Sequence, residues 1–321
     1  MASTSFKSRE YYSSADRRYS LLPFRFKKRN NGNYLLVNEV GEFQMLSSSE
    51  FNAYIRHELL PSTPEYQLLK AKHFLTDGSS SAHFELLASK YRTKKSFLEG
   101  FTKLHIFVTT LRCNQSCPYC QVSRQNESAN AFDMTEEMLH CSIDLMLAGP
   151  APSVTMEFQG GEPLLNFDLL QEAINYTKQK NSTVGKHIEY VVCTNLSILD
   201  DRHLDYFKEH GILISTSLDG PEHVHDKNRP MGKGGSHSVV TRNIQRAQEA
   251  LGKHAISSLM TTTRTSLKYP REIVDEYLRL DLGSIFVRDL NPFGFAVKTQ
   301  SALSYPSQDF LHFYKDVLSY V

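Results

Sequence analysis

From Lys103 onward, short apolar segments alternate with amphipathic ones, and few folds are compatible with such an order. The apolar segments are rich in β-branched residues, whereas the segments between them have helical periodicity. Six pairs follow one another, with apolar parts LHIFVTT, SVTMEF, HIEYVVC, ILISTSL, AISSLMTTT and SIFVRDL. Strands separated by helices pair in parallel through right-handed crossovers. The pattern predicts an α/β fold, a partial (β/α)6 barrel, over residues 100–321.

In parallel barrels the residues that act on ligands lie on loops at the carboxyl ends of the strands. This chain has unusual side chains after each predicted strand, at Cys113–Cys120, Gln159–Pro163, Thr194–Asn195, Ser217–Gly220, Thr261–Arg264 and Asn291–Pro292. We therefore expect one site formed by these loops.

The first loop carries Cys113-Asn-Gln-Ser-Cys117-Pro-Tyr-Cys120. Closely spaced thiolates are the ligands of iron–sulfur clusters. Three of them would leave one iron of a cubane without a protein ligand, open to a small molecule. Structural cysteines or a degenerate zinc loop are the alternatives, although neither His105 nor a later cysteine pair offers zinc its fourth ligand.

Composition excludes several classes of protein. The chain has 40% hydrophobic and 22% charged residues, a net charge of +1, and Lys27–Arg29 as its longest basic run, which argues against a nucleic-acid partner. No apolar stretch reaches the roughly 18 residues of a membrane helix, and the first residues lack a secretory signal. The five cysteines are an odd number and three are clustered, so we expect a reducing cytoplasm rather than disulfides.

The second loop reads Gln159-Gly160-Gly161-Glu162-Pro163. Two glycines at a strand end allow the backbone to approach a ligand closely. Glu162 adds a carboxylate that can accept hydrogen bonds from an amine. Taken alone, an ordinary strand-to-helix turn explains the segment equally well.

Together, the Cys-x-x-x-Cys-x-aromatic-Cys and Gly-Gly-Glu-Pro loops resemble those of the radical S-adenosylmethionine (SAM) superfamily, over residues 103–321. The resemblance implies an enzyme with a [4Fe–4S] cluster on Cys113, Cys117 and Cys120 and with SAM on the open iron. One electron from the cluster then cleaves SAM to a 5′-deoxyadenosyl radical, which abstracts hydrogen from a substrate.

The resemblance also implies how SAM is bound. Gly160, Gly161 and Glu162 are expected to hold its amino group, and Gln159 to lie at the site. A Ser-x-Asp-Gly motif begins at Ser217, and Arg229 follows it as a candidate for the carboxylate. Asn195 is a further candidate contact. For Ser217 and Asn195, ordinary turn chemistry is the alternative.

Other candidates are assigned structural roles. The predicted helix MTEEMLHCSIDLML has an apolar stripe at Met134, Met138, Cys141 and Leu145, and Asp133 resembles its cap. Cys141 and Cys193 are expected to be buried small apolar residues. His223 and His225, on the loop after the fourth strand, could contact substrate, but a surface position is expected for them. Tyr119 is expected to shield the cluster. No catalytic acid or base is assigned.

The first hundred residues predict a different module. LLPFRF and YLLVNEVGEFQML indicate strands with a turn at Gly41. Ser47–Ser49 would cap a helix that carries Phe51, Ile55 and Leu59. We expect a flexible arm over residues 1–19 and a small winged-helix-like α+β module over residues 20–99.

That module resembles the start of the His-Xaa-Ser system radical SAM maturase, in LLPFRF and in YLLVNEVGEFQMLSSSEF. The resemblance implies a precursor peptide with His-Xaa-Ser repeats as substrate, an electron donor and a second maturase. Related modules bind the leader of the precursor along a strand edge. Alternatively, the module only caps the barrel.

The chain departs from this family in one respect: no cysteine follows Cys193, whereas such maturases carry a cysteine-rich C-terminal extension. Because the chain stops at Val321 within a predicted helix, we expect a fragment or a shortened homologue without auxiliary clusters. Two alternatives stay open, a sulfatase-maturase-like enzyme that oxidises a protein Ser or Cys, and a catalytically impaired peptide-binding partner.

Overall fold

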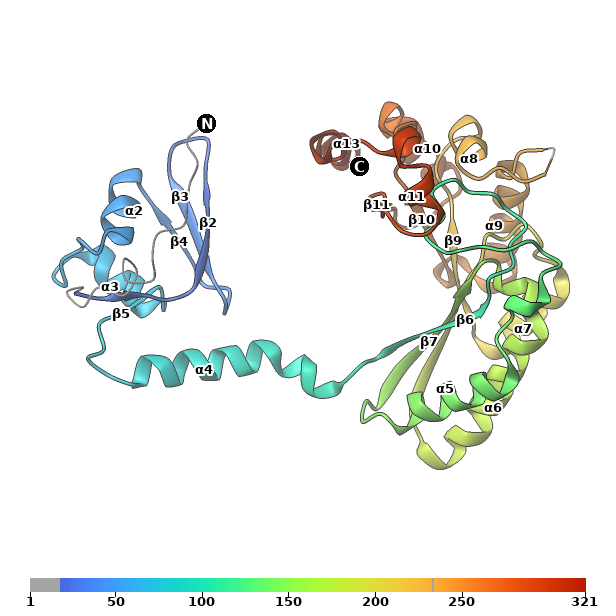
Figure 1. Ribbon diagram of the computed structural model, residues 1–321, viewed down its shortest axis with the longest axis horizontal. Coiled ribbons are helices and arrows are strands. Elements are labelled where there is room, and N and C mark those ends of the chain that lie inside the picture. The colour runs from blue at the N-terminus through green and yellow to red at the C-terminus, as the bar shows by residue number, and fades with distance from the viewer. Residues whose placement is uncertain (1–17, 233) are drawn as a thin grey trace. The chain divides into compact units, whose positions relative to one another are not determined.

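The computed structural model describes residues 18–232 and 234–321. The chain divides into two compact units, Met1–Glu99 and Gly100–Val321 (Figure 1). In the predicted arm, residues 1–17 lie outside the described residues, but Tyr19 is buried and its hydroxyl donates to the Tyr54 carbonyl at 2.8 Å. Tyr19 therefore belongs to the core of the N-terminal unit.

The N-terminal unit is a small α+β module. Its antiparallel sheet has the order β2-β3-β4, and a short antiparallel pair joins β1 to β5. The elements are β1 Ser20–Leu21, β2 Phe24–Lys28, β3 Tyr34–Asn38, β4 Phe43–Leu46, α2 Ser48–Ile55, α3 Pro64–Ala71, β5 Leu75–Thr76 and α4 Ala82–Lys95. Gly41 has a φ of +89°, as the predicted turn requires.

Helix α2 begins as predicted, since the Ser47 hydroxyl accepts from the Glu50 amide. The predicted apolar stripe of this helix is only partly right. Phe51 is buried, but Ile55 is 39% exposed, and Tyr54 takes its place in the core. Phe51 stacks on Tyr34 of β3 with ring centroids 4.1 Å apart, so the sheet selects which face of the helix is buried.

The C-terminal unit is built on a six-stranded parallel sheet, which confirms the predicted α/β fold. Its strands are β6 Leu104–Thr110, β7 Ser153–Gly160, β8 His187–Cys193, β9 Leu213–Ser217, β10 Ile256–Thr261 and β11 Phe286–Arg288. They pair in chain order from β6 to β11, and among the described residues the two end strands do not pair. The sheet is therefore an open, partial barrel.

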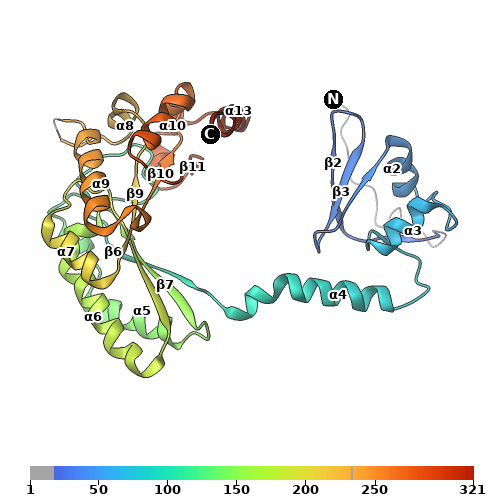
Figure 2. The ribbon, with the colours of Figure 1, turned by 180° about the vertical axis from the view of Figure 1, so that it is seen from behind.

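Helices follow the strands in the predicted alternation. They are α5 Glu136–Ala148, α6 Phe167–Val184, α7 Asp201–His210, α8 Glu222–Asn228, α9 His237–Leu251, α10 Pro270–Arg279, α11 Phe295–Lys298, α12 Gln300–Leu303 and α13 Ser307–Tyr320. Helices α5, α6 and α7 lie along the same side of the sheet in both views (Figures 1 and 2). Their apolar side chains pack on Met156, Phe158 and Val192 of the strands. On the opposite face, Ile106 of β6 is 51% exposed, so that face is open.

Helix α5 corrects two predictions. Its N-cap is Thr135, whose hydroxyl accepts from the Met138 amide at 3.2 Å, whereas Asp133 pairs with Arg112. The predicted stripe points outward, with Leu145 77% exposed. The buried face consists instead of Leu139, Ile143, Met146 and Leu147. The segment offers two apolar stripes, and packing against the sheet selects the second.

Among the described residues, no helix combines the length and the apolar character needed to cross a bilayer.

Candidate functional site

A hollow lies at the carboxyl ends of the parallel strands, where all six strands or their following loops contribute residues. Of the residues predicted for the site, those that line the hollow are Cys113, Cys117, Cys120, Gln159, Gly160, Gly161, Asn195, Ser217 and Arg229. Glu162 does not line it. Gln115, Thr194 and Thr261, which belong to the predicted loops, line it as well. Residues outside the predicted loops also contribute, among them Arg124, Cys193, Ser215, Leu259 and Arg288.

The loop with the three cysteines is held by backbone hydrogen bonds within its own connection and from a segment distant in the chain. The Cys113 amide donates to the Gln125 carbonyl at 3.0 Å, and the Phe295 amide donates to the Cys120 carbonyl at 2.9 Å. All three thiols are free and half-buried. Burial raises the pKa of Cys113 to about 11 and that of Cys117 to about 12. A bound metal has to displace these protons.

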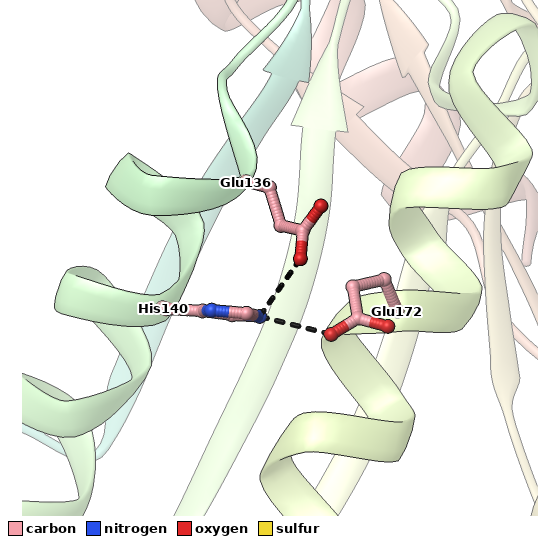
Figure 3. A group of neighbouring side chains, drawn as sticks. All are labelled: Glu136, His140 and Glu172. Carbon is pink, nitrogen blue, oxygen red and sulfur yellow. Dashed lines mark hydrogen bonds and ion pairs between the residues drawn. The ribbon is translucent and has the colours of Figure 1, made fainter.

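The three sulfur atoms do not converge on one point. Among the described residues, only Glu136, His140 and Glu172 form a group whose ligand atoms all lie within 4.8 Å of one another (Figure 3). A single zinc ion needs such convergence, since its ligands lie about 2.0–2.3 Å from one centre. In a cluster, each thiolate binds a different iron, so the sulfurs stay apart. The arrangement favours a cluster over a zinc site.

The convergent group lies on α5 and α6 (Figure 3), and none of its three residues lines the hollow. His140 Nε2 lies 2.9 Å from Glu172 Oε1, and the ring stacks on Tyr176 at 3.8 Å between centroids. Glu136 is mostly exposed. These contacts join two neighbouring helices and account for the group without an ion.

The glycine loop is held against the cysteine loop. The Gly161 amide donates to the Thr110 carbonyl at 2.8 Å, and the Glu162 amide donates to the Arg112 carbonyl at 2.7 Å. A Cβ on Gly160 would collide with the Thr110 carbonyl, and one on Gly161 with the Arg112 carbonyl. Gly160 also has a φ of +139°. The glycines therefore let β7 approach the strand end from which the cysteine loop starts.

Glu162 is fully buried beneath the hollow and does not face into it. Its Oε1 accepts from the Thr194 hydroxyl at 2.6 Å, and its Oε2 accepts from the Asn195 amide at 2.7 Å. Burial raises the pKa of Glu162 to about 7, although these hydrogen bonds oppose the shift. The side chain joins the loop after β7 to the loop after β8.

A buried network centres on Asp219, which the sequence marked only as part of the Ser217 motif. The Tyr119 hydroxyl donates to its Oδ2 at 2.5 Å, and Arg229 Nε donates to the same oxygen at 3.1 Å. Burial opposes the charge of Arg229, but Asp219 raises the pKa of Arg229 above its ordinary value. The guanidinium lies 5.3 Å from the Tyr119 ring centroid. Tyr119 thus orients a cation that lines the hollow.

His225 is buried, contrary to the surface position expected for it. Its Nδ1 accepts from the Asp219 amide at 3.2 Å. Burial lowers the pKa of His225 to about 3, so the ring is neutral and supports the Asp219 loop. His223 packs its ring against Tyr269.

The two remaining cysteines differ from expectation. Cys141 is exposed, because α5 buries its other face. Cys193 is half-buried at the end of β8, and it lines the hollow instead of packing in the core. The alternation of side chains along a strand could have predicted this position. Val192 is fully buried against the helices, so its neighbour Cys193 faces the open side of the sheet.

Two amide side chains at the hollow differ in how their hydrogen bonds are satisfied. Asn195 Nδ2 donates to Asn114 Oδ1 at 2.9 Å and lies 4.0 Å from Cys113 Sγ. Gln115 is 1% exposed and lines the hollow, and its Nε2 has no hydrogen-bond partner among the described residues. A buried amide without a partner is costly unless a bound group accepts its hydrogen bond. Three thiols and this donor fit a cluster with a polar organic ligand.

Comparison with known proteins agrees with this geometry. Residues 107–276 match the Radical SAM superfamily. A cysteine-type anaerobic sulfatase-maturating enzyme of Clostridium novyi is 31% identical over 138 residues, which cover 41% of this chain and 37% of that enzyme. The matched segments span 37% to 65% of three curated relatives, so the chain corresponds to less than two thirds of their length.

Two solved structures share the fold. The structure of anSMEcpe with bound AdoMet and the Cp18Cys peptide has a TM-score of 0.57 and 19% identity, covering 68% of this chain and 59% of that one. SuiB of Streptococcus suis bound to the precursor peptide SuiA has a TM-score of 0.53 and 14% identity, covering 94% of this chain and 70% of that one.

Proposed function

This chain belongs to the radical SAM superfamily, and from that membership we propose that it is a maturase that modifies a ribosomally made precursor peptide. Enzymes of this superfamily use a [4Fe–4S] cluster and SAM, which supply a carbon-centred radical when both are bound and one electron is delivered. A separate electron donor is therefore a required partner.

The residues of this chain have distinct tasks in that reaction. Cys113, Cys117 and Cys120 hold the cluster from a loop that the glycine segment supports. Gly160 and Gly161 present backbone groups to the amino end of SAM, while Glu162 holds the loops in place. Arg229 presents a charged guanidinium to its carboxylate.

Three polar side chains complete the proposed binding surface for SAM. Gln159, Asn195 and Ser217 line the hollow around the cysteine loop. The open side of the sheet gives a large substrate access to the strand ends, while the network of Asp219 keeps water from the buried guanidinium.

The observation that carries the proposal is the pairing of this hollow with a separate N-terminal unit on the same chain. SuiB, described with a bound precursor peptide, shares the fold over 94% of this chain, so the likeness includes the N-terminal unit. On one face of the N-terminal sheet, Val37, Phe43 and Met45 remain exposed, which leaves an apolar surface next to the edge of β4 that no other strand among the described residues pairs with. We propose that residues 20–99 bind the precursor along this edge.

The finer proposal is that the precursor carries His-Xaa-Ser repeats and that a second maturase assists, as the resemblance of the first strands suggests. A sulfatase-maturase-like oxidation of a protein Ser or Cys is the second candidate, supported by the relative from Clostridium novyi and by anSMEcpe. From another class, a peptide-binding partner without catalysis would keep the N-terminal unit but need no cluster.

One experiment separates these possibilities. The chain is reconstituted anaerobically with iron and sulfide, then incubated with SAM, dithionite and either a His-Xaa-Ser repeat peptide or a sulfatase-type Cys peptide. We expect a [4Fe–4S] absorption spectrum, 5′-deoxyadenosine, and a mass change confined to the repeat peptide. A mass change confined to the Cys peptide would favour the sulfatase-type reaction. Peptide binding without iron or 5′-deoxyadenosine would contradict the proposal.

A further inference from the structure

Cys193 is a free thiol in the hollow that the cluster motif does not use. It stands at the end of β8, beside Ser215 of β9 in the strand register, and both residues line the hollow with Cys113. It is half-buried, whereas the other cysteine outside the motif, Cys141, is exposed on α5. Cys193 therefore places a free thiol in the hollow that the proposed function assigns to SAM.

The surroundings of Cys193 keep its hydrogen on sulfur. Its Sγ donates to Glu157 Oε1 at 3.3 Å, and the Gln159 side-chain amide donates to the same carboxylate oxygen. Burial, with the nearby Glu157 charge, raises the pKa of Cys193 to about 12. A thiolate has no hydrogen atom to give, so a thiol held protonated is the form that can react with a carbon radical.

The chemistry of the S–H bond gives this group a role. An S–H bond is weaker than an aliphatic C–H bond, so a thiol transfers its hydrogen atom downhill to a carbon-centred radical. Glu157 is partly exposed and hydrogen-bonded to the sulfur, so it can pass a proton from water to it. Independently, the Gln115 side-chain amide, which has no hydrogen-bond partner for its Nε2 within the part of the chain that the structure describes, indicates that the same hollow is suited to a ligand.

We propose that Cys193 is the hydrogen-atom donor of this site. Its S–H bond breaks as a new C–H bond forms on the substrate carbon that carries the radical or, when substrate is absent, on the 5′ carbon of the deoxyadenosyl radical, which leaves a sulfur radical on Cys193. One electron from the low-potential donor that also reduces the cluster, and one proton from water through Glu157, restore the thiol. A substrate carbon that lost hydrogen to the deoxyadenosyl radical regains one from Cys193, so the reaction at that substrate carbon is redox-neutral.

The inference rests on the SAM cleavage proposed above, and its test needs no peptide. The reconstituted full chain is incubated with SAM and dithionite in D2O, where the Cys193 hydrogen exchanges for deuterium. We expect deuterium in the 5′-deoxyadenosine of the wild type, measured per molecule formed by mass spectrometry. Cys193→Ser keeps the shape and the hydrogen bond but lacks a weak S–H bond, so its product should show only natural-abundance deuterium.

Cys141→Ser is the matched control, the same change on an exposed helix position, and its product should be labelled like that of the wild type. Iron content and the visible spectrum of Cys193→Ser should equal those of the wild type, since this thiol is not a cluster ligand. Full labelling in Cys193→Ser or loss of its iron would contradict the inference. Absence of label in the wild type would also overturn it, whereas absence of 5′-deoxyadenosine there would instead contradict the proposed function.

Discussion

The guanidinium of Arg229 lies against the carboxylate of Asp219 in a buried pair, with Nε donating to Oδ2 at 3.1 Å and Nη2 to Oδ1 at 3.4 Å. Asp219 is fully buried, and its Oδ1 also accepts from the Thr261 amide at 3.0 Å. The positive charge of Arg229, which lines the hollow, is thus balanced by the buried carboxylate of Asp219.

Breaking this pair from the acidic side should be costly. Asp219→Asn leaves the buried guanidinium of Arg229 without its counter-charge. We therefore expect the free energy of unfolding to fall by about 3–5 kcal/mol. Urea denaturation followed by circular dichroism measures it. Asp168→Asn, which breaks the exposed pair with Arg202, is the control and should cost less than about 1 kcal/mol. Equal losses of unfolding free energy in the two variants would show that the buried pair stabilises the fold no more than the exposed pair.

Gly161→Ala should separate the two loops of the site. The new methyl group meets the Arg112 carbonyl, so the backbone must shift, at a cost of about 1–3 kcal/mol. Because Arg112 directly precedes Cys113, we also expect a lower iron content after reconstitution. Gly283→Ala has no atom within 4 Å of the added carbon and should retain the iron of the wild type. Normal iron loading in Gly161→Ala would contradict the close approach of the loops.

Glu162→Gln should destabilise the fold even when SAM is absent. The amide has one acceptor atom, but the carboxylate serves the Asn195 amide with one oxygen and the Thr194 hydroxyl with the other. One buried donor loses its partner, at a cost of about 1–3 kcal/mol. Denaturation of the cluster-free variant measures this loss. A variant as stable as the wild type that fails only to bind SAM would assign Glu162 to the ligand rather than to the loops.

The N-terminal unit should lose stability in acid through Glu42. Burial raises the pKa of this carboxyl, but hydrogen bonds from Lys90, Asn38 and His73 outweigh it and lower the pKa from 4.5 to about 2. A carboxyl with a depressed pKa stabilises the fold above its unfolded value and loses that contribution as the pH falls through the folded value. The window is therefore pH 4.5 to about 2.

Glu42→Gln tests this pH dependence. We expect the variant to unfold at a lower temperature than the wild type near neutral pH, and the difference to shrink inside the acidic window. Scanning calorimetry at both pH values measures it. A difference that stays constant with pH would exclude the charge of Glu42 as its source.

Local signals determined much of this protein. Alternation of apolar and amphipathic segments predicted the parallel sheet, because the periodicity of a strand or a helix can be recognised from residues close together in the sequence. The spacing of Cys113, Cys117 and Cys120, and the pair Gly160–Gly161, predicted two loops of one hollow, because parallel strands end on the same side. Each of these features depends on residues close together in the chain.

Tertiary packing decided the rest. Tyr119 and Asp219 are 100 positions apart, so no local pattern could join them or make Arg229 part of a buried pair. Helix α5 offered two apolar stripes, and only contact with the sheet buried Leu139 and exposed Cys141. Side-chain burial and hydrogen bonding depend on which distant segments meet, and the periodicity of one segment does not contain that information.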